Sequence, residues 1–310
     1  MFIGAGMLII VLVLVMSAMF NDEPPISRVS SLAHKYIYPP KDGLNVGLSQ
    51  GIRLLLLGVF SGIVGGMMGM GGGVVKTSGL LLIFGVDILL VRTVALITNV
   101  FIYGSATYRN AKMEGLILRK VVELMIPGAL IGVALGFLLG NVLHSIWLQR
   151  MLGLFAMISG LLMLKRLYFS NALGVDKVPI TENGEVVEKA KTAGAGLPMG
   201  FVMGLFGISG GVIGVPFQRF LLKIPLKNAI ANSSVTSLVA STVAMVFALW
   251  YEYAYGQYGL STPIIIALWI IPGNIFGAQL GAYMTGILPL RFIKLLYVII
   301  MLVIGIRLFF

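Results

Sequence analysis

The stretch GGMMGMGGGVVKTSG, Gly65 to Gly79, decides how this chain folds, because its glycines interrupt what would otherwise be one long hydrophobic helix. A continuous helix over residues 50 to 85 would be about 54 Å long, since each helical residue adds about 1.5 Å. A bilayer core is only about 30 Å thick. We therefore predict that the chain reverses direction at these glycines, which tolerate positive φ values.

The composition places the rest of the chain in a lipid bilayer. Hydrophobic residues make up 58% of the sequence, charged residues only 11%, and the mean hydropathy is +1.01. Apolar segments long enough to cross a membrane recur throughout, which predicts an all-α polytopic membrane protein. The net charge of +11 does not indicate nucleic acid, because the basic residues lie between apolar segments without an aromatic-basic motif.

Two hydrophobic blocks, residues 50–168 and 195–310, resemble each other. GMGGGVV from Gly69 matches GISGGVI from Gly207 at an offset of 138 residues, and IPGALIGVALG from Ile126 matches IPGNIFGAQLG from Ile271 at an offset of 145. Each block contains a glycine-broken unit and three further apolar helices. We predict these at about 50–85, 88–109, 118–140 and 146–167, and again at about 195–223, 227–252, 262–285 and 290–309.

The remaining segments complete the predicted organisation. Residues 1–20 are expected to form an additional transmembrane helix, 21–49 an external loop, and 169–194 a charged cytoplasmic linker. If both broken units are re-entrant hairpins, most basic residues fall on one side, as the positive-inside rule requires. Each block then has three crossings, so the two blocks are inverted repeats, as in many secondary transporters. We predict a multi-pass protein of the cytoplasmic membrane with its N-terminus cytoplasmic and its C-terminus outside.

The glycine breaks are the candidate functional site. Irregular backbone inside a membrane is tolerated where protein buries it or where it lines a water-filled cavity. A helix that resumes after such a break presents free N–H groups and the positive end of its dipole. With inverted repeats the two breaks would meet near the midplane and attract an anion. The backbone candidates are Gly71, Gly72 and Gly73 in the first block and Ser209, Gly210 and Gly211 in the second.

Polar side chains near the breaks extend this candidate site. Lys76 would add a positive charge, unless it snorkels to the interface from a shallow hairpin. Neutral donors in the following helices would suit an oxygen-rich anion, although hydroxyls and amides also simply pack helices together. These donors are Thr98, Asn99, Asn232, Ser233 and Thr236, with Tyr103, Ser234, Ser237, Asn274 and Gln279 as further polar candidates.

The combination of motifs resembles a known family. GMGGGVVK and GISGGVIGVP, each followed by a polar helix (ALITNVFIYGSATY and ANSSVTSLVAST) and then by IPGxxxGxxxG, are similar to the sulfite exporter TauE/SafE family over about residues 50–310. The resemblance implies a membrane transporter for sulfur-containing anions such as sulfite or sulfonates. Ser209 replaces one glycine of the family's usual pattern, and Lys76 and Thr77 stand where a small residue and proline are more usual.

Other function classes leave weaker traces in the sequence. GISG at Gly207 has the form of an intramembrane serine protease motif with Ser209 as nucleophile, but His34 and His144, its potential bases, fall in predicted loops. An anion channel shares the features of an anion carrier. We expect no enzyme activity, cofactor or metal site. The membrane potential can drive anion efflux at about 2.3 kcal/mol per charge per 100 mV, and the sequence leaves a coupling proton and a homodimer open.

Overall fold

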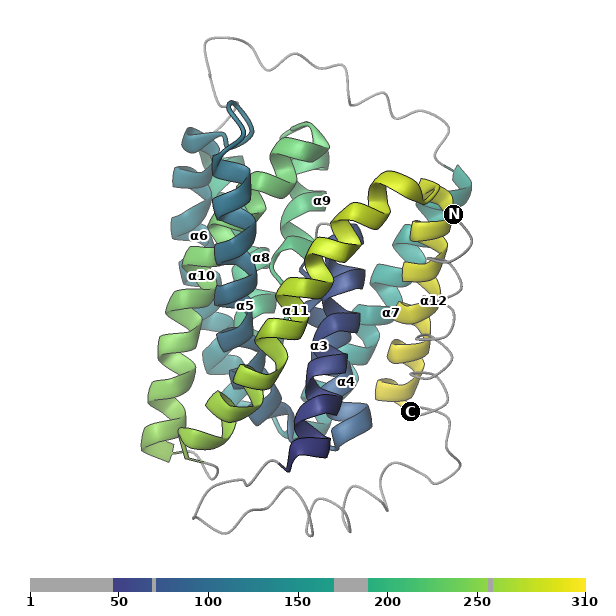
Figure 1. Ribbon diagram of the computed structural model, residues 1–310. Coiled ribbons are helices and arrows are strands. Elements are labelled where there is room, and N and C mark those ends of the chain that lie inside the picture. The colour runs from purple at the N-terminus through teal and green to yellow at the C-terminus, as the bar shows by residue number, and fades with distance from the viewer. Residues whose placement is uncertain (1–46, 69–70, 170–188, 256–258) are drawn as a thin grey trace.

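The computed structural model describes residues 47–68, 71–169, 189–255 and 259–310, and these residues form ten helices with no strand among them (Figure 1). The predicted helix at 1–20, most of the predicted loop at 21–49 and most of the linker at 169–194 lie outside the described residues. The first block contains α3 (Leu48–Met68), α4 (Gly73–Phe84), α5 (Ile88–Ala111), α6 (Arg119–Val142) and α7 (Ser145–Phe169). The second contains α8 (Lys189–Phe206), α9 (Gly211–Leu221), α10 (Leu226–Tyr255), α11 (Ser261–Ile287) and α12 (Leu290–Phe309).

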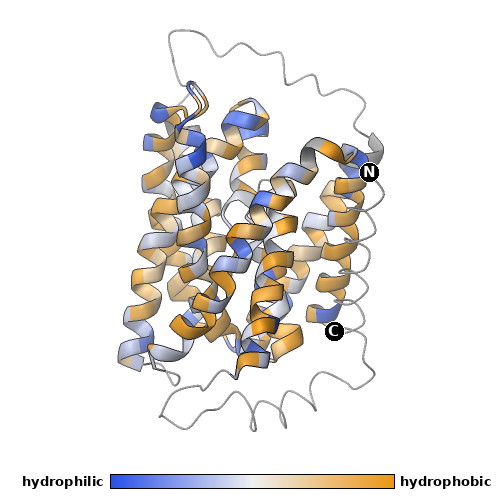
Figure 2. Ribbon diagram, viewed as in Figure 1, coloured by the Kyte–Doolittle hydropathy of each residue, from blue (hydrophilic) through white to orange (hydrophobic). Residues whose placement is uncertain are grey.

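The lengths and hydropathies of these helices confirm the membrane assignment. Within the described residues, seven helices are long and apolar enough to span a bilayer: α3, α5, α6, α7, α10, α11 and α12. Large apolar side chains such as Leu138, Trp147 and Leu268 are exposed along them, as expected of surfaces that contact lipid. Figure 2 shows apolar residues along the length of the helices and hydrophilic ones gathered toward their ends.

Both predicted broken units are divided into two helices. The first unit is α3 and α4, and the second is α8 and α9; within each unit the two helices contact each other. In Figure 1, α4 runs back toward the end of the bundle where α3 begins, and α9 runs toward the opposite end. The glycines thus interrupt the helix as predicted. By length and composition, however, α3 is able to span the bilayer, whereas the apolar part of α8 is shorter, Thr192–Phe206.

The two reversals use different backbone conformations. Gly71 and Gly72 have φ values of 79° and 61°, in the left-handed region that favours glycine, whereas Gly73 is already the first residue of α4. In the second unit the positive φ falls on Gly207, at 70°, and Gly210 has right-handed α geometry. The sequence analysis placed the second turn at Ser209, Gly210 and Gly211 and did not indicate that the positive φ falls on Gly207.

Helices of the first block pack most extensively against helices of the second block. The most extensive contacts join α3 of the first block to α11 of the second, and α8 of the second to α6 of the first. Glycines spaced by four residues lie against the partner backbone in both pairs and permit this close approach. These glycines are Gly58, Gly62 and Gly66 with Gly273, Gly277 and Gly281 in the first pair, and Gly128, Gly132 and Gly136 with Gly196, Gly200 and Gly204 in the second.

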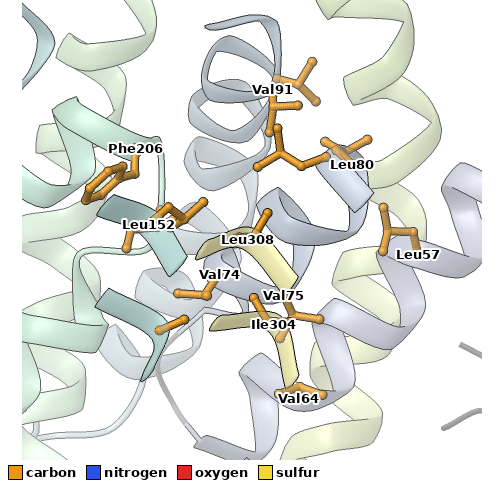
Figure 3. Packing of buried hydrophobic residues seen from close by; sticks show 14 of the residues in the cluster. Leu57, Val64, Val74, Val75, Leu80, Val91, Leu152, Phe206, Ile304 and Leu308 are labelled. Atoms are coloured by element: carbon orange, nitrogen blue, oxygen red, sulfur yellow. The ribbon is translucent and has the colours of Figure 1, made fainter. Parts of the chain in front are cut away.

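The short helix α4 is enclosed by protein. Val74 and Val75 at its start are buried, and they belong to one hydrophobic cluster with Leu152 of α7 and Ile304 of α12 (Figure 3). Leu80, further along α4, is fully buried in the same cluster. An interrupted helix inside a membrane requires such protein surroundings, because lipid cannot satisfy backbone groups freed at the break. The packing of α4 therefore fixes the first turn in the interior of the bundle.

Candidate functional site

The two glycine turns are in direct contact. A Cβ atom added to Gly71 would lie 2.6 Å from Ser209 Oγ, and one added to Gly73 would overlap the backbone nitrogen of Ser209. All three residues belong to the predicted breaks, and Gly71 and Ser209 are equivalent positions at the offset of 138. Only hydrogen at these two glycine positions allows the turns to approach so closely.

The residues that directly precede α4 and α9, Gly72 and Gly210, are glycines and provide no side-chain cap to the first N–H groups. At α9 the phenolic oxygen of Tyr103 accepts a hydrogen bond from the Gly211 N–H at 3.5 Å, and it also shares a hydrogen bond with Ser209 Oγ. An oxygen from α5 therefore lies at the positive end of α9, where an anion would be favoured.

A cavity borders these turns. It has a volume of about 70 Å³, compared with the roughly 10–15 Å³ that one water molecule requires. Gly71 and Gly211 line it, which places both turns at its wall. The α3–α11 pair forms one side and the α5 and α10 helices form another. The lining residues are Gly62, Gly65, Gly66, Gly71, Ile102, Tyr103, Ser105, Ala106, Arg109, Asn110, Gly211, Ile230, Ser233, Ser234, Asn274, Ala278 and Gln279.

Two of the lining side chains distinguish this cavity from a packing defect. Asn274 is fully buried, and neither its Oδ1 nor its Nδ2 has a hydrogen-bond partner among the described residues. Buried amides are normally hydrogen-bonded, so an unpartnered one beside a cavity indicates a ligand or water. Arg109, near the end of α5, is exposed and supplies a positive charge where the cavity approaches the surface.

Lys76 lies in the interior but does not line this cavity. Its side chain is fully buried, so it does not snorkel to the interface. The ammonium donates to the Ala95 carbonyl at 3.3 Å, to Asn99 Oδ1 at 3.0 Å and to Thr98 Oγ1. Asn99 Nδ2 in turn donates to the Gly207 carbonyl at 3.0 Å. Lys76, Thr98 and Asn99 thus form one cluster that connects α4, α5 and the second turn.

The predicted residues of α10 divide between the cavity and helix packing. Ser233 lines the cavity, whereas Asn232 accepts from the Leu118 N–H at 2.8 Å and donates to Gln218 Oε1 at 3.1 Å. Thr236 Oγ1 donates to the backbone carbonyl of Asn232 at 3.0 Å. Asn232 therefore holds α10 against α9 and the loop before α6, whereas Thr236 bonds within α10 itself. Gly210 contacts side chains of α8 and α10, and Gly72 contacts the Ser61 carbonyl of α3.

The sequence analysis did not include Arg109 and Asn110 among the site residues. Residues 99, 103 and 110 are separated by four and seven positions, so they share one face of α5. Asn99 and Tyr103 on this face contact the second turn, and Asn110 lines the cavity. Asn110 could have been identified from the sequence, because it lies eleven positions after Asn99 and seven after Tyr103 and therefore on the same helix face.

The site has the chemistry of an anion-binding site. Two helix N-termini, the buried Lys76 side chain and the exposed guanidinium of Arg109 can contribute positive potential, and hydroxyl and amide groups provide neutral donors. The alternative of protease chemistry at Ser209 has no such support among the described residues, because the Ser209 hydroxyl is hydrogen-bonded to Tyr103 and His144 lies in the loop between α6 and α7. The other potential base, His34, lies outside the described residues.

Comparison with known proteins identifies the family of the chain. The family model for sulfite exporter TauE/SafE matches residues 54–308. The chain is 35% identical over 280 residues to the probable membrane transporter protein MamO of Paramagnetospirillum magneticum, covering 83% of this chain and 44% of that protein. It is 36% identical over 281 residues to MamO of Magnetospirillum gryphiswaldense, again covering 83% and 44%. The chain therefore spans less than half the length of these two relatives.

A third relative matches over nearly its whole length. The probable membrane transporter protein YunE of Bacillus subtilis is 26% identical over 277 residues, which cover 84% of this chain and 97% of YunE. No solved structure matches the chain. The family and these relatives are membrane transporters rather than enzymes. The chain is a multi-pass membrane protein that belongs to the sulfite exporter TauE/SafE family of transporters.

Proposed function

We propose that this protein is a secondary transporter that moves a small sulfur-containing anion, of the sulfite or sulfonate type, across the cytoplasmic membrane by alternating access. The observation that carries the proposal is the meeting of the two glycine turns beside a cavity lined by Gly71 and Gly211. Each turn precedes a helix N-terminus, which attracts negative charge; the Gly211 N–H at the start of α9 now donates to Tyr103, and a bound anion would replace the tyrosine oxygen there.

The electrostatics of the cavity favour a negative substrate. The described residues that line it include Arg109 but no carboxylate and no histidine. Lys76 lies outside the cavity wall, on α4, and adds positive potential to the cavity. Its three hydrogen bonds all go to neutral oxygens of α5, which do not compensate its charge. Charge is weakly screened in a low-dielectric interior, so this ammonium acts on the cavity without touching the substrate.

The position of the cavity supports a rocking mechanism. It lies between the closely packed α3–α11 pair on one side and α5 and α10 on another. Because α3 and α11 come from different blocks, as do α6 and α8, the reciprocal pairing supports two inverted repeats that move relative to each other. Movement of the α3–α11 pair would close the cavity at the Arg109 end and open it on the other side of the turns.

The membrane potential is the energy source that the site favours. A proton-coupled carrier usually has a titratable carboxylate or histidine at its centre, and none lies among the described cavity residues. Glu123, near the start of α6, is exposed. Anion efflux driven by an inside-negative potential needs no coupling proton, and a coupling proton is the alternative. The proposed orientation puts the loops joining α5 to α6 and α9 to α10 in the cytoplasm and the C-terminus outside.

Counterflow tests transport by a carrier. Proteoliposomes preloaded with unlabelled sulfite should accumulate [³⁵S]sulfite transiently, because a carrier exchanges bound substrate across the membrane. An anion channel would show no acceleration by internal sulfite. A panel of sulfite, thiosulfate, a sulfonate and acetate, each measured by thermal stabilisation of the purified protein, identifies the substrate class. Stabilisation by cations alone would refute the anion assignment.

A further inference from the structure

Arg92 is a buried cation that the proposed substrate cavity does not use. It lies on α5, its side chain is only 2% exposed, and it does not line the cavity. Its Nη2 donates to Asn141 Oδ1, whereas Nε and Nη1 have no hydrogen-bond partner among the described residues. A buried guanidinium with two unpartnered nitrogens is costly, because these donors have lost water without gaining an acceptor.

The guanidinium occupies a specific slot. Its carbon lies 4.4 Å from the centre of the Phe137 ring, and a Cβ atom on Gly140 would overlap Nη1. Phe137 and Gly140 both belong to α6, as does Asn141, so α6 forms a wall around this side chain. An aromatic face and a small residue surround the guanidinium, and neither provides a hydrogen-bond acceptor for Nε or Nη1.

The position of Arg92 relates it to the second glycine turn. A Cβ atom on Gly207 would lie 2.8 Å from the Arg92 carbonyl oxygen and 2.9 Å from its Cα, so the reversal at Gly207 packs directly on Arg92. Tyr103, which contacts Ser209 and Gly211 of the same turn, is about 16 Å further along α5 at 1.5 Å per residue. The cavity residues of α5 begin at Ile102 and continue to Asn110. Arg92 and the cavity therefore lie on opposite sides of the turn contacts along α5.

One face of α5 connects the two regions. Residues 92, 99, 103 and 110 are separated by seven, four and seven positions, which places them in one row on the helix. Each carries a polar side chain, and each is buried. Buried polar side chains on one helix face inside a hydrophobic bundle are typical of a pathway for a polar solute.

We propose that Arg92 forms a second anion-binding site, which takes a small oxyanion on the far side of the Tyr103–Ser209 contact from the substrate cavity. The inference rests on the proposed function and extends it. Arg92 would bind the anion after the two turns separate and the anion leaves the substrate cavity. Asp87 and Glu252 contribute negative potential at Arg92, which weakens anion binding there. Weak binding suits a transfer site, because conduction requires that the anion also leave.

Binding stoichiometry tests this site. Isothermal titration of the full-length purified protein with sulfite should give two sites per chain in the wild type and one in Arg92→Gln. Arg92→Lys, which keeps the positive charge, should retain two sites with at least a tenfold weaker affinity at one of them. Arg150→Gln is the matched control and should keep both sites unchanged. Arg150 is an exposed arginine on α7. The helix α7 lies close to the start of α5, because its first residue, Ser145, donates a hydrogen bond to Asp87.

The outcomes separate this proposal from the function it extends. One sulfite site in both the wild type and Arg92→Gln, with equal affinity, refutes the Arg92 site and leaves the cavity site intact. No sulfite binding to the folded wild type refutes both. Loss of all binding in a folded Arg92→Gln protein also refutes a separate second site, since the cavity should still bind. If Arg92→Gln does not fold, the titration of Arg92→Lys with sulfite tests the proposal instead. Two sites with wild-type affinities, or only one site, would contradict it.

Discussion

The hydroxyl groups of Tyr103 and Ser209 share a buried hydrogen bond, and this bond joins α5 of the first repeat to the glycine turn of the second. The Tyr103 oxygen also accepts from the Gly211 N–H, so one phenol satisfies groups on both sides of the turn. The bond lies where the chain must open if an anion is to pass from the cavity toward Arg92. We therefore propose that this bond closes the path between the cavity and Arg92 in this conformation.

A double-mutant cycle measures the strength of this closure. Tyr103→Phe and Ser209→Ala each remove one partner of the bond, and the double variant removes both. We expect a coupling free energy of about 0.5–1.5 kcal/mol for unfolding in detergent, the usual net contribution of a hydrogen bond. Additive effects of the two substitutions would contradict the contact. Counterflow should also accelerate in Tyr103→Phe, because opening the pathway no longer breaks this bond.

Gly73→Ala tests whether the turns must touch. The added methyl group would overlap the backbone nitrogen of Ser209, so the two turns must move apart. We expect a loss of about 1–3 kcal/mol in the free energy of unfolding, as for overpacked cores, and loss of transport. Gly104→Ala on α5 is the matched control, since its Cβ would meet nothing closer than Leu238 Cδ1 at 4.0 Å.

Thermal unfolding and counterflow distinguish the two glycine variants. Gly104→Ala should be neutral or stabilise the protein by up to about 1 kcal/mol, because alanine favours helix over glycine. Wild-type transport in Gly73→Ala would show that close contact of the turns is dispensable for the anion site.

Lys76→Met tests the role of the buried ammonium at a distance. At an effective dielectric constant of about 20, two unit charges about 10 Å apart interact by about 1.7 kcal/mol. We therefore expect sulfite to bind about tenfold more weakly, although Lys76 does not line the cavity. Titration of the folded variant with sulfite measures the change. Unchanged affinity would limit Lys76 to holding Thr98 and Asn99 in place.

Asn274→Leu and Asn99→Leu form a matched pair. The Asn274 side chain lines the cavity and has no hydrogen-bond partner among the described residues, so its loss should change stability little. Asn99 accepts from Lys76 and donates to Gly207, so its loss leaves buried groups unpaired and should cost about 1–3 kcal/mol. Sulfite binding should weaken in Asn274→Leu. Normal binding in that variant would place the anion elsewhere in the cavity.

The sequence alone determined the membrane class and the positions of the two breaks, and it predicts the duplication. These properties follow from hydropathy and from glycine spacing, which are local or repeated along the chain and need no knowledge of the packing. The start of α4 at Gly73, directly after two glycines with positive φ, illustrates how a run of glycines defines a helix boundary. The family assignment followed from the same motifs.

Only the tertiary structure decided which polar residues share a site. Lys76, Thr98 and Asn99 are brought together by the contact of α4 with α5, and Asn232 is diverted to Gln218 and the Leu118 N–H. Side-chain type gives no indication of which partner a polar group finds, because that depends on which helices pack against each other. The packing of α3 against α11 and of α6 against α8 set those contacts. In the same packing Arg92 is buried, and its Nε and Nη1 have no partner among the described residues.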